Sequence, residues 1–382
     1  MKAVHFGAGK IGRGLVGLLL SQTGYEVVFV ARNDKQIRMM QERGRYTVIM
    51  ANAAKETAVV NNITAIHVGD EELVGRTVAA ADLITTAVGA ASLPQVGKTL
   101  ARGIVGRLLA NEKPLHIIAC ENALGGSRKL KEAVFASLPR ELHARADRQL
   151  AFPGALIDRI VPEQQSDDPL TVKVEPFYEW IIHRPEVRKG FHGIRGVQYA
   201  DVLEPFAERK LFTVNTGHCS AAYFGYAKGY KTIQETLNDA EVRRQVEGVM
   251  RETGGLLMRK FGLAEAEHDL YIRRTLERFA NPSLTDKVTR VGRSPLRKLS
   301  SQERLVLPAM QALGGGAGVP HLTAAMAAGL RFDPRDDAEA MRLQTLIRDK
   351  GVGWVIERQM GIPAEHELHG LVARRYERQA LQ

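Results

Sequence analysis

The segment AVHFGAGKIGRG, residues 3–14, decides the fold of the first part of the chain. Residues 3–6 are apolar and are predicted to form a short strand, and residues 7–12 match the pattern GxGxxG. An apolar helical stretch follows and ends at Gly24, and a second strand is predicted at residues 26–30. A glycine-rich turn between a strand and a helix is typical of a dinucleotide-binding site.

Each glycine of the turn has its own predicted role. Gly7 allows the tight turn, Gly9 lets the main chain approach a pyrophosphate, and Gly12 lets the helix pack closely against the strand. The helix N-terminus would then face the phosphate charge. An ordinary strand-to-helix turn is the alternative, but the flanking strand and helix signals favour a nucleotide site. The candidate cofactor-binding residues are Ala3, Val4, His5, Phe6, Gly7, Ala8, Gly9, Lys10, Ile11, Gly12, Arg13, Gly14 and Arg32.

The residues after the second predicted strand bear on the choice of cofactor. A dinucleotide site of this kind expects Asp or Glu there, to accept hydrogen bonds from the adenosine ribose. The chain has Ala31-Arg32-Asn33-Asp34 instead. Arg32 would admit the extra phosphate of NADP, whereas Asp34 could still reach the ribose of NAD. These residues therefore leave both cofactors open.

The length of 382 residues favours two domains. Buried strands separated by helical stretches come first, and long amphipathic helices predominate beyond about residue 195. The further predicted strands are 83–88, 115–120 and 155–161, and the predicted helices are 203–230, 240–261 and 264–279, with residues 46–68 left open. We therefore predict an α/β fold, with a Rossmann-type doubly wound parallel sheet in residues 1–194 and a mostly α-helical domain in residues 195–382.

Composition limits the partners of the chain. A net charge of +10 favours anionic partners, but aromatic residues make up 6% and the cations are interspersed with acids. A small phosphorylated metabolite is therefore favoured over nucleic acid. The densest apolar run, residues 15–20, is too short to cross a membrane. The two cysteines imply no disulfide framework, fit a reducing cytoplasm and are too few for a four-cysteine zinc site. We expect a monomer or a weak homodimer.

Hydride transfer from an alcohol needs a base for the hydroxyl proton and donors that stabilise the developing alkoxide. Short-chain dehydrogenases use Tyr and Lys four residues apart, and none of the nine tyrosines has Lys at that spacing. Zinc alcohol dehydrogenases use cysteine ligands, for which Cys120 and Cys219 lack a set of partners. The remaining common solution is a Lys or His base in a helical second domain.

The segment KLFTVNTGH, residues 210–218, supplies such a base. At about 100° per residue, Lys210, Asn215 and His218 can share one broad helix face. Burial would lower the pKa of Lys210, and the neutral amine would then be a usable base near neutral pH. Asn215 can donate to an alkoxide, and His218 can bond a hydroxyl or hold the lysine. From spacing alone, a solvent-facing lysine and a core histidine are the better interpretation.

A family resemblance changes this balance. The segment matches the K-x4-N-x2-H signature of the polyol-specific long-chain dehydrogenases, and the chain resembles that family over nearly its full length. The matching stretches are KAVHFGAGKIGRG from Lys2, DLITTAVG from Asp82, IIACEN from Ile117, DRIVP from Asp158, ERKLFTVNTGH from Glu208 and RVGRSPLRKLS from Arg290. The resemblance implies a metal-independent oxidoreductase that interconverts D-mannitol 1-phosphate and D-fructose 6-phosphate with NAD.

The resemblance also implies roles for single residues. Lys210 would be the general base, with Asn215 and His218 in the same site. Asn122 lies just past a predicted strand and resembles a second asparagine of the family, so Asn122 and Asn215 would hold the oxyanion together. Asp158 either orders this site or fills a capping or buried ion-pair role. No metal is implied.

A basic stretch in the second predicted domain is a candidate for binding the substrate phosphate. Residues 286–304 contain six basic side chains against two acids. Most of the six fit a solvated basic face. Because the arginine fork donates two parallel hydrogen bonds to phosphate oxygens, one or two of Arg293, Arg297 and Lys298 are the candidates.

Three other functions compete with this interpretation. A hydroxyacid or ketopantoate-type reductase also joins a dinucleotide domain to a helical one, but places Lys and Asn closer together. A redox sensor that holds NAD(H) without chemistry would not need Lys210, Asn215 and His218 as a set. Charge alone would allow a nucleic-acid-binding protein, which salt-sensitive DNA retention without turnover would favour.

Overall fold

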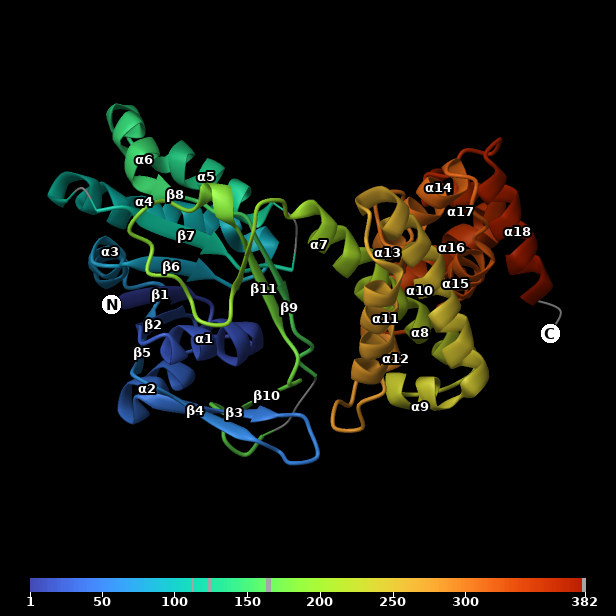
Figure 1. Cartoon of the computed structure of the whole chain (residues 1–382), viewed down its shortest axis with the longest axis horizontal. Helices are drawn as coiled ribbons and strands as arrows, with labels where there is room; N and C mark the ends of the chain where they lie inside the picture. Colours follow the sequence, from blue (N-terminus) through green and yellow to red (C-terminus); the bar gives the residue numbers. More distant parts are fainter. Residues whose placement is uncertain (112, 123–124, 163–165, 380–382) are drawn as a thin grey trace. The chain divides into compact units, whose positions relative to one another are not determined.

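The computed structural model describes residues 1–111, 113–122, 125–162 and 166–379 and divides into two compact units, Met1–Glu204 and Pro205–Gln382 (Figure 1). The sequence placed the domain boundary after residue 194. The first unit extends further because β12 (Gln198–Ala200) pairs with β11 (Glu179–His183).

The first unit is built on a six-stranded sheet in the order β5-β2-β1-β6-β7-β8, with parallel pairing throughout. The chain builds outward from β1 in one direction and then from β6 in the other. The strands are β1 (Lys2–Phe6), β2 (Glu26–Ala31), β5 (Ile63–His67), β6 (Leu83–Thr86), β7 (Leu115–Ala119) and β8 (Leu150–Ala151). The predicted Rossmann-type sheet is confirmed, and its strand order reverses between β1 and β6, where such sheets bind ligands.

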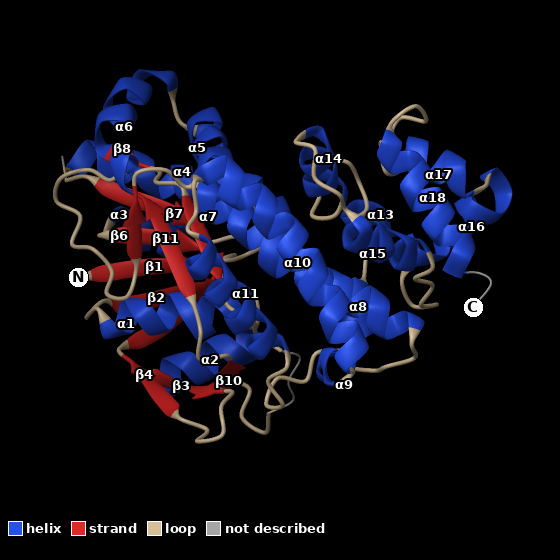
Figure 2. Ribbon diagram, turned by 45° about the vertical axis from the view of Figure 1, so that its right-hand side comes forward, coloured by secondary structure: helices blue, strands red, loops and turns tan. Residues whose placement is uncertain are grey.

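Both faces of this sheet are covered (Figure 2). Val27 and Phe29 of β2 belong to one core and Val28 and Val30 to the other, because successive side chains of a strand point to opposite faces. The α-helices and π-helix of the unit are η1 (Gly12–Gly17), α1 (Leu18–Gln22), α2 (Asp34–Arg43), α3 (Glu71–Ala79), α4 (Leu93–Ala110), α5 (Gly126–Ser137) and α6 (His143–Gln149). Short 3-10 helices are η2 (Ala90–Ser92), η3 (Arg140–Leu142) and η4 (Arg184–Glu186).

Two smaller sheets flank the main one. Residues 46–68, left open by the sequence, form most of β3 (Arg45–Met50), β4 (Thr57–Asn61) and β5, and β10 (Val172–Val174) completes the sheet β10-β3-β4. The strand predicted at 155–161 is β9 (Ala155–Asp158). It pairs antiparallel with β11 in a third sheet, outside the parallel one.

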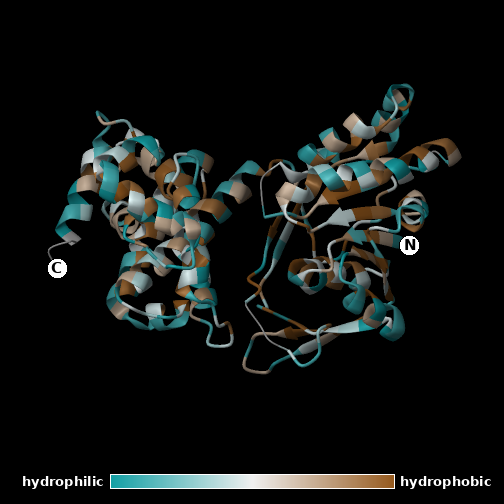
Figure 3. Cartoon of the chain, turned by 180° about the vertical axis from the view of Figure 1, so that it is seen from behind, coloured by the Kyte–Doolittle hydropathy of each residue, from teal (hydrophilic) through white to brown (hydrophobic). Residues whose placement is uncertain are grey.

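In the described part of the second unit every regular element is a helix, as predicted. The predicted helix 203–230 comprises α7 (Glu204–Arg209), η5 (Lys210–Asn215) and α8 (Thr216–Ala227). The others are α9 (Ile233–Asn238), α10 (Ala240–Phe261), α11 (Glu265–Phe279), α12 (Val288–Gly292), α13 (Pro295–Lys298), α14 (Val306–Gly314), α15 (Pro320–Leu330), α16 (Ala338–Lys350), α17 (Val352–Arg358) and α18 (Glu367–Gln379). Most of α8 is buried, and α9, α10, α12 and α15 pack around it. Figure 3 shows the apolar residues, in brown, along the strands and within the helical unit.

Candidate active site

The glycine turn after β1 is fixed by its conformation at Gly7 and by packing at Gly12. Gly7 has φ of +108°, which favours glycine, and its N–H donates to the main-chain oxygen of Val30 at 3.0 Å. A Cβ on Gly12 would lie 2.0 Å from the Gly7 oxygen, so only glycine lets the helix come this close. The tight turn and the close packing predicted for these two glycines are confirmed. A Cβ on Gly9 would meet nothing within 4 Å, so the space beside Gly9 is open.

The helix after the turn opens with the wide segment η1, a π-helix. A Cβ on Gly14 would lie 2.5 Å from Cγ1 of Val174, and one on Gly17 would lie 2.5 Å from Oη of Tyr46. Both glycines therefore let the sheet β10-β3-β4 pack against the helix. For Gly14, a candidate for cofactor binding, this packing already accounts for the glycine.

Arg13, another candidate in this stretch, is buried. Its guanidinium donates to the main-chain oxygens of Ala8, Pro169 and Leu170 at 3.0, 3.0 and 2.6 Å. Burial lowers the pKa of Arg13, but these carbonyls accept the hydrogens of its Nε and Nη1. The side chain thus braces the turn through Ala8. The side chains of β1 from Ala3 to Phe6 are buried as well, so this strand positions the turn rather than exposing groups of its own.

Arg32, the cation beyond β2, has a different environment. It is exposed and forms no hydrogen bond or ion pair within the described part of the chain. Its neighbour Asn33 caps α2 by accepting a hydrogen bond from Gln36 N at 2.9 Å, and an Asp34 carboxylate oxygen lies 4.0 Å from Nε2 of His67. Arg32 is therefore available to an anionic ligand at the end of β2.

The carboxyl end of β7 carries Glu121, which the sequence analysis missed, and the candidate donor Asn122. The Glu121 side chain is 5% exposed and accepts hydrogen bonds from Thr86 Oγ1, Val88 N and Gly89 N at 2.8, 3.0 and 2.8 Å. The carboxylate therefore ties the loop after β6 to the end of β7. Asn122 is exposed directly beyond this tie. The sequence signal that could have identified Glu121 is an acidic residue directly after a buried strand.

In the second unit, Lys210 and Asn215 are the first and last residues of the π-helix η5. The prediction of a shared face assumed a regular α-helix, in which residues five apart lie about 140° from each other. Hydrogen bonds from i to i+5 bring residues five apart onto one side, as i to i+4 bonds do for residues four apart in an α-helix. The wide turn thus groups Lys210 and Asn215 more tightly than predicted. Lys210 is only 6% exposed.

Hydroxyl groups support this wide turn. The main-chain N–H of Thr216 bonds to the oxygen of Leu211, five residues earlier, and the Thr216 hydroxyl lies 2.9 Å from the same oxygen. Thr253 of α10 donates to the main-chain oxygen of Phe212 at 2.8 Å. Gly217 lets α10 approach, because a Cβ there would lie 2.8 Å from Sδ of Met250. The π-helix is therefore built into the contact with α10.

His218, one turn further along α8, is held on two sides. Its ring stacks on Phe279 with centroids 4.5 Å apart and planes at 15°, and its Nε2 lies 3.4 Å from Oδ2 of Asp286. Asp286 is 2% exposed, and its other oxygen accepts from Nε of Arg290 at 2.6 Å. Burial alone would raise the pKa of Asp286, but His218 and Arg290 outweigh burial and hold this pKa below its ordinary value.

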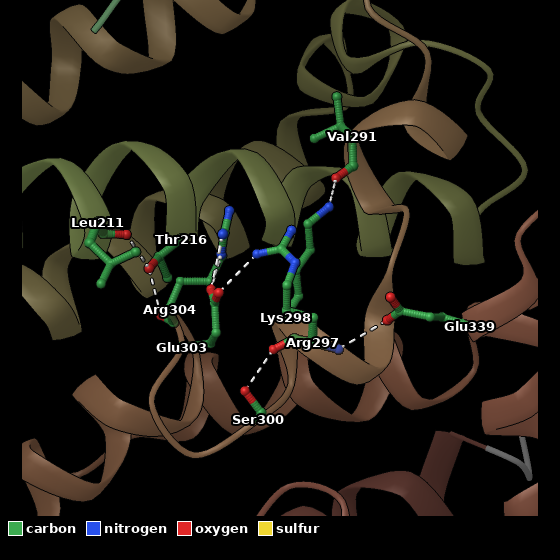
Figure 4. A network of polar contacts seen from close by, with 9 residues as sticks. All are labelled: Leu211, Thr216, Val291, Arg297, Lys298, Ser300, Glu303, Arg304 and Glu339. Atoms are coloured by element: carbon green, nitrogen blue, oxygen red, sulfur yellow. Dashed lines mark hydrogen bonds and ion pairs between the residues drawn. The ribbon is translucent and has the colours of Figure 1, made fainter. Parts of the chain in front are cut away.

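The basic stretch 286–304 contacts the first residue of α8 (Figure 4). The Thr216 hydroxyl lies 2.6 Å from the main-chain oxygen of Arg304. Lys298 is buried and donates to the oxygen of Val291, and burial lowers the pKa of Lys298 to about 8. Arg297 pairs with Glu303 at 2.8 Å.

Of the three phosphate candidates, Arg293 differs from Arg297 and Lys298. It is exposed, and its side chain makes no hydrogen bond or ion pair with any residue that the structure describes. Arg293 follows directly on α12, the helix that carries Arg290. It is therefore the candidate whose guanidinium is available.

A few features bear on metals and membranes. Within the described ranges, no three His, Cys, Asp or Glu side chains gather so that they could hold a metal ion. Cys120 and Cys219 are both buried free thiols. None of the described helices is both long and apolar enough to span a bilayer.

The fold defines a class of two-domain proteins in which a Rossmann-type unit precedes a helical unit. Within this class, the chain belongs to the mannitol dehydrogenase family. The model of the mannitol dehydrogenase Rossmann domain matches residues 1–196, and that of the mannitol dehydrogenase C-terminal domain matches residues 202–378. The chain is therefore an oxidoreductase of the polyol dehydrogenase type.

Individual relatives agree with this assignment. The chain is 45% identical to the mannitol-1-phosphate 5-dehydrogenase of Anoxybacillus flavithermus, over 96% of this chain and 97% of that protein. It is 42% identical to the protein of the same name from Bacillus subtilis, over 98% and 99% of the two chains.

Solved structures share the fold at low sequence identity. The Pseudomonas fluorescens mannitol 2-dehydrogenase in a ternary complex with NAD and D-mannitol has a TM-score of 0.78 at 18% identity, covering 99% of this chain and 91% of that one. A ketopantoate reductase from Ralstonia eutropha reaches a TM-score of 0.50 at 16% identity, covering 90% and 100%. The fold is thus nearer to the mannitol enzyme than to this reductase.

Proposed function

We propose that this chain interconverts D-mannitol 1-phosphate and D-fructose 6-phosphate with a nicotinamide cofactor. The observation that carries the chemistry is the buried Lys210 at the start of a wide helical turn, with Asn215 at the end of that turn and His218 one turn beyond. The names of relatives that are 42–45% identical over nearly the whole chain support the substrate pair.

The glycine turn fits a dinucleotide. Gly7 has the positive φ that the turn requires, and the open space beside Gly9 would admit the diphosphate against main-chain N–H groups. The bound nicotinamide ring would accept or supply the hydride. NAD is the cofactor we expect from the family, and Arg32 would extend binding to NADP through its 2′-phosphate.

Arg32→Ala tests the contribution of this cation to cofactor choice. We expect kcat/KM with NADPH to fall relative to that with NADH, because the variant loses a charge that only the 2′-phosphate would meet. Steady-state assays with each cofactor measure the ratio, and Arg38→Ala, an exposed cation of α2, is the matched control. A ratio that stays at the wild-type value rules out Arg32 as the determinant.

The side chains of the second unit would handle the proton and the oxygen. In the oxidative direction, neutral Lys210 takes the proton of the hydroxyl that is oxidised. The amide of Asn215 donates to that oxygen as negative charge develops on it, and Asn122 of the first unit is the second candidate donor. His218 accepts a hydrogen bond from a substrate hydroxyl.

Lys210→Ala tests the base. We expect turnover of fructose 6-phosphate, followed by reduced-nicotinamide absorbance, to fall by about 10²–10⁴ while the affinity for cofactor is kept. Lys228→Ala, at an exposed ion-paired lysine just after α8, is the matched control and should keep full turnover. Activity of Lys210→Ala within about tenfold of wild type, roughly 1.4 kcal/mol in barrier, contradicts the assignment. Cofactor binding without turnover in the wild type would instead indicate a non-catalytic sensor.

Arg293 is our candidate for the phosphate handle, with Arg297 and Lys298 in lesser roles because both are committed to protein partners. Arg293→Ala is expected to raise KM for fructose 6-phosphate more than KM for unphosphorylated fructose, since only the former loses a charge-assisted contact. Arg273→Ala, at an exposed arginine of α11, is the matched control. An equal change in both KM values places the handle elsewhere.

A further inference from the structure

The contacts of His218 and Asp286 limit where the imidazole proton can lie. Both Nε and Nη2 of Arg290 contact Oδ1 of Asp286, which leaves Oδ2 facing Nε2 of His218 at 3.4 Å. An ionised carboxylate only accepts hydrogen bonds. Oδ2 is buried and has no other hydrogen-bond donor among the described residues, so a hydrogen on the ring nitrogen that faces it would satisfy it.

We propose that Asp286 is a positioning residue that holds His218 in the tautomer with the proton on Nε2, so that Nδ1 is presented as a hydrogen-bond acceptor to a substrate hydroxyl. Nδ1 makes no hydrogen bond with any residue in the described ranges. The stack on Phe279 fixes the plane of the ring. The hydroxyl as ligand rests on the proposed function, whereas the tautomer rests only on the contacts within the second unit.

Arg290 makes the arrangement testable, because it decides how an amide at position 286 would turn. In Asp286→Asn the guanidinium still requires an oxygen at the Oδ1 position. The NH2 group must then take the Oδ2 position and donate toward Nε2 of His218. Nε2 can accept only by losing its hydrogen, so the substitution is expected to move the proton to Nδ1 and remove the acceptor.

The test is ¹⁵N NMR of the histidine ring nitrogens in the full-length protein at about pH 8.5, where an ordinary imidazole is neutral. The His218→Gln variant identifies the His218 signals. We expect the Nε2–H tautomer in the wild type and the Nδ1–H tautomer in Asp286→Asn. Asp333→Asn, the same change at an exposed acid of the second unit, should leave the wild-type pattern.

Each NMR outcome decides the proposal. A wild-type ring with its proton on Nδ1, or with both nitrogens protonated, overturns it, and so does an unchanged tautomer in Asp286→Asn. If Asp286→Asn does not fold, Arg290→Gln replaces it, because the carboxylate remains and the Nε2–H tautomer should persist. Loss of the Nε2–H tautomer in Arg290→Gln, in which the Asp286 carboxylate is still present, would overturn the proposal that Asp286 sets the tautomer.

Kinetics provide the second measurement. Asp286→Asn should lower kcat for fructose 6-phosphate at least about tenfold and leave KM for the reduced cofactor unchanged, since the glycine turn is untouched. Equal loss of kcat and of cofactor affinity would indicate a merely structural role and overturn the proposal. A wild type without turnover on this substrate would refute the proposed function, while the tautomer result would stand.

Discussion

The chain contains a π-helix in each unit, and the two are stabilised in different ways. In η1, the oxygens of Arg13 and Gly14 accept hydrogen bonds from Tyr46 Oη and Arg159 Nη1, each at 2.7 Å. These donors are large, buried side chains. In η5, the hydroxyls of Thr216 and Thr253 contact the oxygens of Leu211 and Phe212 instead.

This difference in support corresponds to the groups that each segment can offer a ligand. The segment η1 has the sequence GRGLVG, and all six of its residues are buried. The turn that precedes it therefore offers a ligand mainly its main chain, with open space at Gly9. The segment η5 has Lys210 and Asn215 at its two ends, so it offers side chains. The first arrangement suits anion binding by N–H groups, and the second suits proton transfer.

Substitution of a turn glycine should produce the largest effect. In Gly12→Ala, the new methyl group would lie 2.0 Å from the Gly7 oxygen and 2.6 Å from Nε2 of His5, so strand and helix must separate. We expect a loss of at least about 3 kcal/mol in the free energy of unfolding, which is at the upper end of the usual cost of an overpacked core. Urea unfolding followed by circular dichroism measures it.

Gly9→Ala is the matched control for Gly12→Ala. Gly9 has no positive φ, and its methyl group would meet no protein atom. The variant should unfold within about 1 kcal/mol of the wild type. Its affinity for the cofactor should nevertheless fall, because the methyl group occupies space that the proposal gives to the diphosphate. Unchanged cofactor affinity in Gly9→Ala would contradict binding at this turn.

Local sequence signals predicted the Rossmann-type sheet and the helical second unit, but they did not by themselves decide the candidate site. The strand, glycines and helix of residues 3–14 are contiguous, so their pattern predicts the turn directly. Lys210, Asn215 and His218 are also on one continuous helical stretch, but their spacing alone favoured a solvent-facing lysine and a core histidine. Their assignment to one site depended on the family resemblance. A contiguous pattern does not show whether a helix contains a wider π-helical turn. The hydrophobic period near 3.6 looks the same with or without that turn.

Partners that are distant in sequence could not be predicted. Arg13 was a candidate for cofactor binding because it directly follows the glycine turn, but its acceptor on Pro169 is 156 residues away. The hydroxyl that donates to the main-chain oxygen of Phe212 belongs to Thr253, 41 residues later in the chain. The carboxylate beside His218 belongs to Asp286. Such pairs depend on tertiary packing, and a single sequence gives no sign of which distant side chain will fill them.

Removing one supporting hydroxyl from each π-helix should have a smaller effect and tests the comparison between them. Tyr46→Phe removes the donor to Arg13 of η1, and Thr253→Val removes the donor to Phe212 of η5. Each leaves a buried carbonyl without that hydrogen bond, which costs about 1–3 kcal/mol in the free energy of unfolding. We expect Tyr46→Phe to leave kcat near the wild-type value, because the main-chain turn is still braced by Arg13 through Ala8.

Thr253→Val should lower kcat in addition to stability. Without the hydroxyl, the segment can tighten toward an α-helix, in which Lys210 and Asn215 would diverge by about 140° and no longer act on one oxygen. Steady-state kinetics and urea unfolding on both variants separate the two quantities. Equal changes in kcat for Tyr46→Phe and Thr253→Val would mean that the width of η5 has no part in the chemistry, and the two π-helices would then differ only in how they are held.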